Sequence, residues 1–430
     1  MNTDTIFALS SGAGKSGVAV IRISGTDLHN AADMMAGRHV TPRTAHFANL
    51  HDDAGRLIDQ VLVLYFPAPR SFTGEDVIEI HCHGAPAVIR KIFDFLATQN
   101  MRMATPGEFS RRAFDNDKMD LADVDGLAAL LDAQTERQRQ MALKSMTGGD
   151  GRVYDAWRTQ MIEIAAYSAA ILDYADDDLP PDIADTVRDR TQKLYDEIQS
   201  ALSRYAAVRA VRGGFNIALV GNPNVGKSSL FNRMVGTARA IVSDVPGTTR
   251  DVVTANLDID GYMVNLSDTA GLRDTTDTVE RIGIERTYNE MENADLVLRV
   301  VTADDVPDTI ADNEILVINK SDLNECHPHS NAICISAHTG DGMDTLMTQI
   351  RTRMHALMDG AESQLVVNAR THALLTDALD ALGAAIRAGD NFDIMAENVR
   401  MASVAIGKIL GVISAADVMD ATFGQLCLGK

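Results

Sequence analysis

The chain is 430 residues long and contains 39 Lys and Arg against 60 Asp and Glu, which gives a formal net charge of −21. This length is enough for two to four domains of roughly 100–200 residues each. A hydrophobic content of 46% can build sizeable cores, and 23% charged residues is ordinary for a folded protein. The acidic surface disfavours a protein that grips RNA or DNA by its own diffuse charge, unless a local basic patch or a basic partner compensates.

Four cysteines are scattered along the chain, at positions 82, 326, 334 and 427. They form no disulfide framework and no pair of CxxC clusters, which favours the reducing cytoplasm. Residues 1–17 lack a basic region followed by an apolar core, so we expect no signal peptide. No uncharged apolar run approaches the roughly 18 residues that a membrane span needs. We therefore expect a cytoplasmic protein that does not enter a membrane.

The N-terminal third has the pattern of a mixed α/β domain. Short runs rich in β-branched residues lie between turns that contain Gly or Pro, at residues 18–24, 60–66 and 76–80. Each of these runs predicts a strand. We place the first domain at residues 1–118.

From about Asp120 the pattern changes to that of amphipathic helices, with apolar residues three and four positions apart. Helix-like sequence continues to about Val211, and residues 173–182, which contain acids and two prolines, predict an exposed connection within it. Alanine-rich helical sequence returns in the last part of the chain. We therefore predict two halves of one helical domain, at residues 119–211 and 361–430.

Between these halves the sequence predicts a parallel α/β module. Strand-like runs alternate with helix-like runs, which is typical of a parallel sheet with crossover helices. The strand-like runs are residues 215–220, 264–268, 296–301, 315–318 and 332–335. We place this module at residues 212–360, inserted into the helical domain.

The segment from Gly221 to Ser228, GNPNVGKS, fits the phosphate-binding pattern GxxxxGK[ST] and stands between a predicted strand and a predicted helix. Its glycines let backbone N–H groups converge on phosphate oxygens beside a helix N-terminus. Lys227 supplies a charge to the β- and γ-phosphates, and the Ser228 hydroxyl can ligate Mg²⁺. The same loop is expected to contact the nucleotide through Asn224, Val225, Gly226 and Ser229.

Two further motifs follow later strands of the module. The DTAG sequence that begins at Asp268 places a carboxylate near the metal and a glycine N–H near the γ-phosphate. The NKSD sequence that ends at Asp322 offers a carboxylate to the N1–H and exocyclic amine of guanine, which adenine cannot present. A short SA sequence beyond it is similar to the base-contacting loop of such GTPases. The expected nucleotide contacts from these motifs are Asp268, Thr269, Ala270, Gly271, Asn319, Lys320, Asp322, Ser336 and Ala337.

A switch that senses the γ-phosphate is expected between the P-loop and Asp268. The SDVPGTTRD sequence at residues 243–251 lies there, and Thr249 is its best candidate for a magnesium ligand. The residue after the DTAG glycine is Leu272, which cannot orient water as the glutamine of signalling GTPases does. No arginine finger can be assigned either. Another group must therefore offset the charge and position the water.

Taken together, the motifs resemble the MnmE (TrmE) family of tRNA uridine-modification GTPases. The P-loop GNPNVGKSSL, the switch DVPGTTRD and the DTAGLRD segment occur with a terminal Cys-x-Gly-Lys sequence at residues 427–430. Several ribosome-assembly GTPases share the P-loop and switch motifs. The terminal motif combined with residues 71–76, 106–109 and 116–118 is specific to this family, and the resemblance covers the whole chain.

The resemblance implies a multidomain fold, α/β plus all-α. A Ras-like P-loop GTPase domain would be inserted into a helical domain, and a mixed α/β folate-binding and dimerisation domain would precede it. The resemblance also implies a homodimer that works with an FAD-dependent partner, MnmG (GidA). Together they would install an aminomethyl or carboxymethylaminomethyl group at C5 of the tRNA wobble uridine, using 5-formyl- or 5,10-methylene-tetrahydrofolate.

The folate site of the family maps onto four residues, Arg22, Glu79, Lys118 and Lys430. The chemistry agrees with this mapping, since recognition of the pterin needs a carboxylate and the glutamate tail needs cations. Cys427 lies beside the last of these residues. It could act as a nucleophile, align the substrate, or simply pack in a terminal helical turn.

The resemblance also supplies the catalytic groups that the motifs lack. Glu280 maps onto a carboxylate that orients the attacking water. A K⁺ ion would offset charge between the phosphates as an arginine finger does. Its expected ligands are Asn224, Ser243, Val245 and Thr248.

The alternative is a ribosome-assembly GTPase switch of the Era-like class, without folate chemistry. A basic KH-like module would favour it, and the flanking sequence contains none. A pure scaffold would require broken nucleotide motifs, and these are intact. We therefore predict a K⁺-dependent GTP hydrolase with Mg²⁺ that acts on tRNA as part of a complex.

Overall fold

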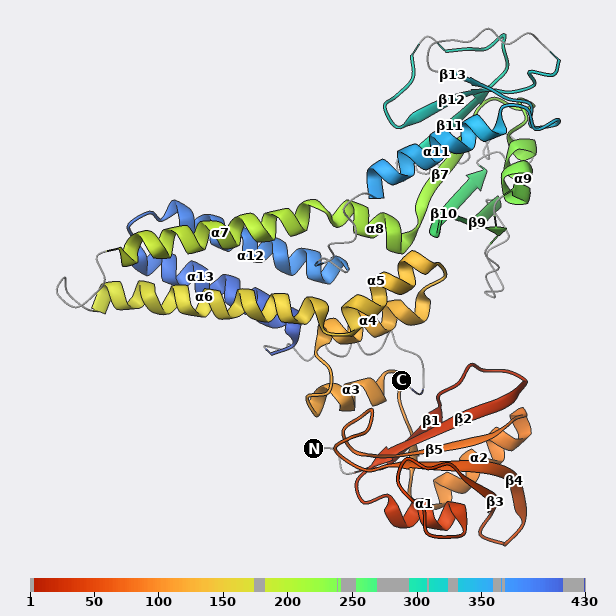
Figure 1. Ribbon diagram of the computed structural model, residues 1–430, viewed down its shortest axis with the longest axis vertical. Helices are drawn as coiled ribbons and strands as arrows, with labels where there is room; N and C mark the ends of the chain where they lie inside the picture. Colours follow the sequence, from red (N-terminus) through yellow and green to blue (C-terminus); the bar gives the residue numbers. More distant parts are fainter. Residues whose placement is uncertain are drawn as a thin grey trace, which may run out of the picture. The chain divides into compact units, whose positions relative to one another are not determined.

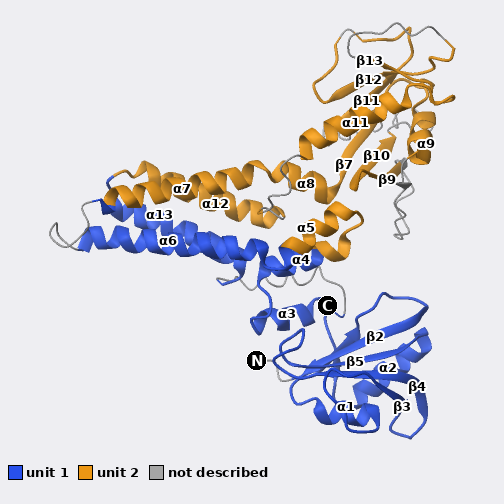
Figure 2. Cartoon of the chain, in the orientation of Figure 1, with its two compact units in different colours: residues 1–128, 145–183, 390–430 blue, residues 129–144, 184–389 orange. Residues whose placement is uncertain are grey.

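The computed structural model describes residues 4–173, 182–237, 239–240, 253–268, 294–307, 309–323, 332–358, 365, 368–412 and 429 (Figure 1). The chain divides into two compact units, each built from segments that lie apart in the sequence (Figure 2). The first unit comprises residues 1–128, 145–183 and 390–430, and the second comprises residues 129–144 and 184–389.

The first unit contains a six-stranded sheet in the order β3-β4-β5-β2-β1-β6. Its neighbouring strands are antiparallel except β1 and β6, which are parallel. Side chains alternate between the two faces, so that Val61, Val63 and Tyr65 are buried while the residues between them are more exposed. The strands are β1 (Ile6–Leu9), β2 (Ser16–Gly25), β3 (His46–His51), β4 (Leu57–Phe66), β5 (Asp76–Gly84) and β6 (Arg102–Met103).

Two helices, α1 (His29–Ala36) and α2 (Pro86–Thr98), pack against this sheet (Figure 1). α2 begins with Pro86, whose fixed φ suits the first helical position. α1 ends at Gly37, whose φ of 65° is the left-handed conformation that closes many helices. The core between the sheet and the helices is apolar, and its buried members include Phe7, Ile23, Val63, Ile80 and Leu96.

A buried ion network fastens α3 (Glu108–Asp115) to this sheet. Arg102 donates to both carboxylate oxygens of Glu108, at 2.9 Å and 2.5 Å, and Arg112 donates to Glu75 at 2.9 Å. Glu108 and Arg112 are only 8% and 5% exposed. Burial acts to raise the pKa of Glu108, but the hydrogen bonds and charge of Arg102 outweigh it and lower that pKa to about 2.

The helices of the first unit come from both sides of the inserted module. α6 (Gly149–Asp173) precedes the module and α13 (Phe392–Leu410) follows it, and the two lie side by side (Figure 1). Trp157 of α6 and Val399 of α13 are buried. α4 (Leu121–Asp132) begins in the same unit. The two helical segments therefore pack together, a point that the sequence alone left open.

The second unit contains a seven-stranded sheet in the order β13-β12-β11-β7-β10-β9-β8. The strands from β13 to β10 are parallel, and β9 is antiparallel to both of its neighbours. The strands are β7 (Phe215–Val220), β8 (Arg239–Ala240), β9 (Val253–Ile259), β10 (Tyr262–Asp268), β11 (Leu296–Val301), β12 (Glu314–Ile318) and β13 (Ala332–Cys334).

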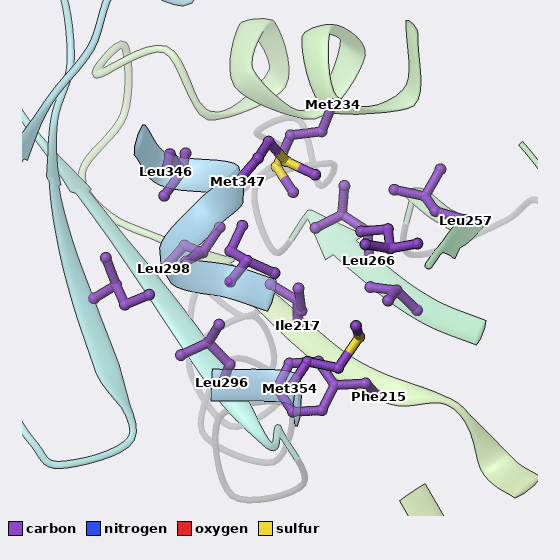
Figure 3. Packing of buried hydrophobic residues seen from close by; sticks show 14 of the residues in the cluster. Phe215, Ile217, Met234, Leu257, Leu266, Leu296, Leu298, Leu346, Met347 and Met354 are labelled. Carbon is purple, nitrogen blue, oxygen red and sulfur yellow. The ribbon is translucent and has the colours of Figure 1, made fainter. Parts of the chain in front are cut away.

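Two helices, α9 (Lys227–Thr237) and α11 (Met343–Met358), enclose the core of this sheet. Figure 3 shows Phe215 and Ile217 of β7 packed between Leu266 of β10, Leu298 of β11 and the methionines of the two helices. Met234, Met347 and Met354 fill the space against the helices, and all are less than 5% exposed. Unbranched methionine suits such irregular gaps.

The described part of the second unit also contains the helices α5 (Glu136–Met146), α7 (Ile183–Ser203), α8 (Tyr205–Gly213) and α12 (Ala369–Arg387). Asn368 caps α12, since its side chain accepts a hydrogen bond from the Thr371 N–H at 2.8 Å. Met141 of α5 packs in the core of the seven-stranded sheet. Part of the helical sequence therefore belongs by its contacts to the α/β module.

The predicted architecture is confirmed, with a mixed α/β domain in front and a parallel module inserted into helical sequence. The strands predicted at residues 215–220 and 296–301 have those bounds, and the others lie within observed strands or extend one residue beyond them. The domain boundaries at residues 118, 211 and 360 stay predictions.

Cys334 is disulfide-bonded, which the scattered cysteine spacing did not predict. Among the described residues, no helix is both long enough and apolar enough to cross a membrane.

Candidate functional site

The P-loop connects the end of β7 to the start of α9, as the sequence predicts. Gly221 and Gly226 have φ angles of 149° and 99°, which side-chain-bearing residues rarely adopt. A Cβ at Gly221 would lie 2.1 Å from the Val300 carbonyl oxygen, and one at Gly226 would lie 2.2 Å from Nδ2 of Asn319. Both glycines are therefore required by backbone conformation and by close neighbours.

Lys227, the first residue of α9, points back over the loop. Its Nζ donates hydrogen bonds to the carbonyl oxygens of Gly221 and Asn222, at 2.7 Å and 2.9 Å. The side chain is buried, and burial lowers the pKa of Lys227, although the charge of Asp268 acts against this shift. The ammonium group is thus held at the centre of the loop, where phosphate oxygens are expected.

Ser228 and Asp268 form the candidate magnesium site. The Ser228 hydroxyl donates to Oδ2 of Asp268 at 2.9 Å, which joins the first turn of α9 to the end of β10. Asp268 is only 2% exposed. Two hard oxygen donors side by side, with phosphate and water to complete the shell, match the ligands that Mg²⁺ prefers. The residues present therefore fit the ion.

Asn319 joins the P-loop to the candidate base-binding loop. Its Nδ2 donates to the Val225 carbonyl oxygen at 2.9 Å, and its Oδ1 accepts from the Ala337 N–H at 3.0 Å. The side chain is 4% exposed, so both hydrogen bonds are shielded from water. Lys320 adds a second link, since its Nζ donates to the Asn224 carbonyl oxygen at 2.7 Å. One short segment after β12 thus fixes two separate loops.

Asp322 lies exposed beside the same loop and accepts a hydrogen bond from the buried Ser336 hydroxyl at 2.6 Å. This hydrogen bond lowers the pKa of Asp322, so the carboxylate is charged at neutral pH. A charged, oriented carboxylate can accept both the N1–H and the exocyclic amine of guanine. This geometry suits the predicted contact of Asp322 with guanine.

Sequence reasoning missed Arg233 of α9. Its Nε donates to the Ala337 carbonyl oxygen at 3.1 Å, and its Nη2 also donates to the His338 carbonyl oxygen. These bonds hold the base-binding loop against the helix that starts at the P-loop. No motif marks Arg233, because the contact joins segments that are far apart in the chain.

Several predicted site residues lie outside the described residues. They are Ser243, Val245, Thr248, Thr249, Thr269, Ala270, Gly271, Glu280, Cys427 and Lys430. Ser229 and Asn224 are described and exposed, while Val225 is buried. Asn224 adopts a φ of 65°, a conformation that asparagine tolerates better than most residues.

The first unit brings together two of the four predicted folate-site residues. Arg22 and Glu79 face each other across β2 and β5, and the guanidinium donates to Oε1 of Glu79 through Nε at 3.1 Å and Nη2 at 2.9 Å. The guanidinium lies over the Phe72 ring, 5.0 Å from its centroid, and 6.0 Å from that of Phe109. A carboxylate with aromatic neighbours suits a flat heterocycle with an amidine-like edge.

The other end of the chain reaches the same sheet. The Ser10 hydroxyl donates to the Gly429 carbonyl oxygen at 2.9 Å. A Cβ at Gly429 would lie 2.2 Å from the Leu9 carbonyl oxygen, so only glycine allows this approach. Leu9 pairs with Ile21, the neighbour of Arg22. Gly429, the residue before Lys430, therefore lies against the end of β1, the strand that pairs with the Arg22 strand.

Lys118 follows α3 and lies beside the segment at residues 71–76. A Cβ at Gly74 would lie 3.2 Å from Cε of Lys118 and 2.8 Å from Cβ of Asn116. Asn116 in turn donates to the Thr73 carbonyl oxygen at 2.8 Å. Both segments were among those that suggested the family, and the structure shows that they pack against each other.

Comparison with known proteins decides the family. Residues 5–118 match the family model described as GTP-binding protein TrmE N-terminus, and residues 121–427 match the model described as MnmE helical domain. The chain belongs to the MnmE family. It is 39% identical to the tRNA modification GTPase MnmE of Dinoroseobacter shibae, over 99% of this chain and 100% of that protein. It is 42% identical to the protein of the same name from Azorhizobium caulinodans, over 100% and 99% of the two chains.

Membership of the MnmE family confirms the predicted family, fold class and enzyme class. The chain matches these relatives along essentially its whole length. The finding favours an MnmE-type GTPase over the alternative of an Era-like ribosome-assembly switch. Two groups of the predicted site residues are described in this chain: the loops around Lys227 and Asn319, and the Arg22–Glu79 pair.

Proposed function

We propose that this chain hydrolyses GTP and uses the cycle to drive modification of the tRNA wobble uridine. The observation that supports this most directly is the double hydrogen bond of Asn319, which joins the P-loop to the loop beside Asp322. The side-chain amide of Asn319 thereby holds the proposed phosphate-binding loop and the proposed guanine-binding loop in fixed relative positions. The names of the relatives, tRNA modification GTPase MnmE, supply the substrate class.

The residues around the P-loop act on the phosphates. Phosphate oxygens of GTP would replace the loop carbonyls as acceptors for Lys227, and its buried ammonium would act in a medium of low dielectric. Ser228, with Asp268 nearby and Thr249 from the switch, would hold Mg²⁺, which supplies charge neutralisation for the β- and γ-phosphates. Glu280 would orient the attacking water.

A K⁺ ion is the proposed substitute for an arginine finger. Asn224 stands on the exposed rim of the P-loop, where its side-chain amide oxygen is available. Oxygen donors without a formal charge suit a large monovalent cation. The other expected ligands, Ser243, Val245 and Thr248, belong to the switch.

The N-terminal domain is the proposed folate site. Glu79 would accept from the pterin edge, with Arg22 orienting the carboxylate through two hydrogen bonds. Lys118 and Lys430 would pair with the carboxylates of the folate tail. We propose a homodimer that acts with the FAD-dependent partner MnmG (GidA). The product would carry an aminomethyl or carboxymethylaminomethyl group at C5 of the wobble uridine.

The test compares GTP and ATP hydrolysis by the full chain and by Asp322→Ala. Removing two hydrogen bonds to a charged acceptor should weaken GTP binding by roughly 10²- to 10⁴-fold, because each contributes roughly 1.5–3 kcal/mol. Asp312→Ala is the control, since that carboxylate is exposed in the same module. Nucleoside analysis of tRNA from a deletion strain that expresses each variant gives the second readout. If Asp322→Ala keeps its preference for GTP, or the wild-type chain restores no wobble-uridine modification, the proposal is wrong.

A further inference from the structure

Three metal-binding side chains meet on the surface of the N-terminal domain, in a place that the GTP and folate sites do not use. They are His29, Asp33 and His39. One donor atom from each lies within 4.8 Å of the other two. Nδ1 of His39 lies 3.0 Å from Oδ2 of Asp33, and Nε2 of His29 lies 3.8 Å from the same oxygen. It is the one such group among the residues that the structure describes.

Local folding brings these residues together. His29 and Asp33 are four positions apart in α1, so they lie on the same face of the helix, one turn apart. Gly37 then ends the helix in the left-handed conformation, and the Arg38 N–H donates to the Asp33 carbonyl oxygen at 3.1 Å. This turn reverses the chain and returns His39 to the side of Asp33. The cluster depends on one helix and its C-terminal cap, not on a flexible tail.

Neighbouring groups orient each donor. The Val40 N–H donates to Oδ1 of Asp33 at 2.8 Å, which leaves Oδ2 directed toward the histidines. The His29 ring packs against the Tyr65 ring at 5.3 Å between centroids and against the His39 ring at 5.0 Å. Partners of this kind usually hold metal ligands in place.

The His29–Asp33 spacing suits a shared ion better than a direct hydrogen bond, whereas His39 and Asp33 lie at hydrogen-bond distance. At 3.8 Å, the His29–Asp33 pair is too far apart for a good hydrogen bond. Two ligands at about 2.0–2.2 Å from a tetrahedral zinc ion are separated by roughly 3.4 Å. A small movement of the half-exposed His29 ring would therefore place both atoms at bonding distance. The ion would replace the proton that His39 and Asp33 share.

We propose that His29, Asp33 and His39 form a site for a divalent transition metal, with water at the remaining position. Two imidazoles and one carboxylate suit Zn²⁺, Ni²⁺ and Cu²⁺, whereas Mg²⁺ prefers a shell of oxygen atoms. Zn²⁺ is the ion on which the test is based. The bound ion would link α1 to the segment that follows its cap. The site is independent of GTP binding and of the proposed function.

The experiment is calorimetric titration of the full chain with ZnCl₂, in the presence of saturating GDP and Mg²⁺ so that the P-loop site is occupied. His29→Ala and His39→Ala should each weaken one Zn²⁺ site at least tenfold. His83→Ala is the matched control, because Nδ1 of His83 lies 2.7 Å from Oδ1 of Asp59 and forms a histidine–carboxylate pair outside the cluster. The cysteines elsewhere in the chain are the same in all variants, so any Zn²⁺ that they bind contributes equally to every titration.

Electron paramagnetic resonance with one equivalent of Cu²⁺ gives a second readout that does not depend on affinity. The wild-type spectrum should show two coupled nitrogen ligands, and each histidine variant should show the loss of this pattern. Equal Zn²⁺ stoichiometry and affinity in wild type, His29→Ala and His39→Ala would overturn the proposal. A loss of equal size in His83→Ala would overturn it as well, because binding would then not be specific to the cluster.

Discussion

Asn319 shows how much a single side chain contributes to the nucleotide site. Its amide donates to the P-loop and accepts from the base-binding loop, while its neighbour Lys320 holds Asn224. These hydrogen bonds hold the P-loop and the base-binding loop in place before any ligand binds. Motif spacing predicted the residues of the site, because the phosphate and guanine contacts impose fixed residue types. It could not predict Arg233 or Ser10, whose partners are over 100 and over 400 positions away in sequence.

Glu108 provides a stability test at the scale of one residue. Its pKa is lowered to about 2, so its contribution to stability is fully present above its ordinary value of 4.5 and is lost as the pH falls toward 2. Glu108→Gln removes the charge that pairs with Arg102 and Arg112. We expect a loss of about 2–4 kcal/mol at pH 7, since one partner of a buried pair is removed, and a smaller loss at pH 3.

Fluorescence of Trp157 measures this effect during urea unfolding. It is the single tryptophan of the chain, it is buried in α6, and it belongs to the same unit as Glu108. Glu397→Gln is the control, because the hydrogen bond from Arg400 also lowers the pKa of Glu397 but that pair is exposed and belongs to the same unit. Equal midpoints for wild type and Glu108→Gln at pH 7 would contradict the assignment.

Among the elements, the β9–β10 hairpin lies between two parts of the predicted nucleotide site. Its two strands connect the predicted switch at residues 243–251 to Asp268 of the candidate magnesium site. At its turn, the Arg137 N–H of α5 donates to the Gly261 carbonyl oxygen at 3.3 Å, and the Arg137 guanidinium lies over the Tyr262 ring. A helix from the flanking sequence is thereby attached to the hairpin that leads to Asp268.

Gln138 attaches α5 to the module at a second point. Its Nε2 donates to the carbonyl oxygens of Val211 and Arg212, at 3.2 Å and 2.9 Å, just before β7. Periodicity predicted α5 as part of a helical domain. Its attachment to the module was not predictable, because a helix face does not identify the surface that will cover it.

Gln138→Ala should uncouple GTP hydrolysis from wobble-uridine modification. We expect GTP hydrolysis within about threefold of wild type and wobble-uridine modification reduced on the order of tenfold, since about 1.4 kcal/mol of coupling corresponds to that factor. Gln140→Ala is the matched control on the same helix, because Gln140 is exposed and bonds only within α5 through Glu136. Single-turnover hydrolysis and tRNA nucleoside analysis measure the two activities. Parallel losses of both would show that Gln138 supports the fold of the module instead.

At the scale of the whole molecule, the net charge of −21 argues against direct capture of tRNA by this chain alone. The C-terminal end of the chain instead contacts the N-terminal domain. α13 packs against α6, and Gly429 accepts a hydrogen bond from Ser10 beside the Arg22 strand. The weak grip on tRNA stays a prediction from composition. The return of the tail was an assumption of the sequence analysis, and the described contact of Gly429 supports it.

The ion that replaces the arginine finger should be visible in the kinetics of the full chain. We expect GTP hydrolysis in K⁺ to exceed that in Na⁺ at equal ionic strength, on the order of tenfold or more, because a smaller ion would lose contact with part of the ligand ring. Asn224→Ala should lower the rate in K⁺ toward the rate in Na⁺. Equal turnover in both salts would exclude a specific monovalent site.

We propose that GTP hydrolysis and tRNA modification are separate chemical steps joined through the fold, and that the chain terminus belongs to the proposed folate site. The most direct measurement compares two variants for GTP hydrolysis and for wobble-uridine modification in a deletion strain. Glu280→Ala should bind GTP but lose both activities. Deletion of residues 427–430 should leave hydrolysis largely intact and abolish modification. If the truncated chain modifies tRNA at the wild-type level, the role of the terminus and the coupling are both contradicted.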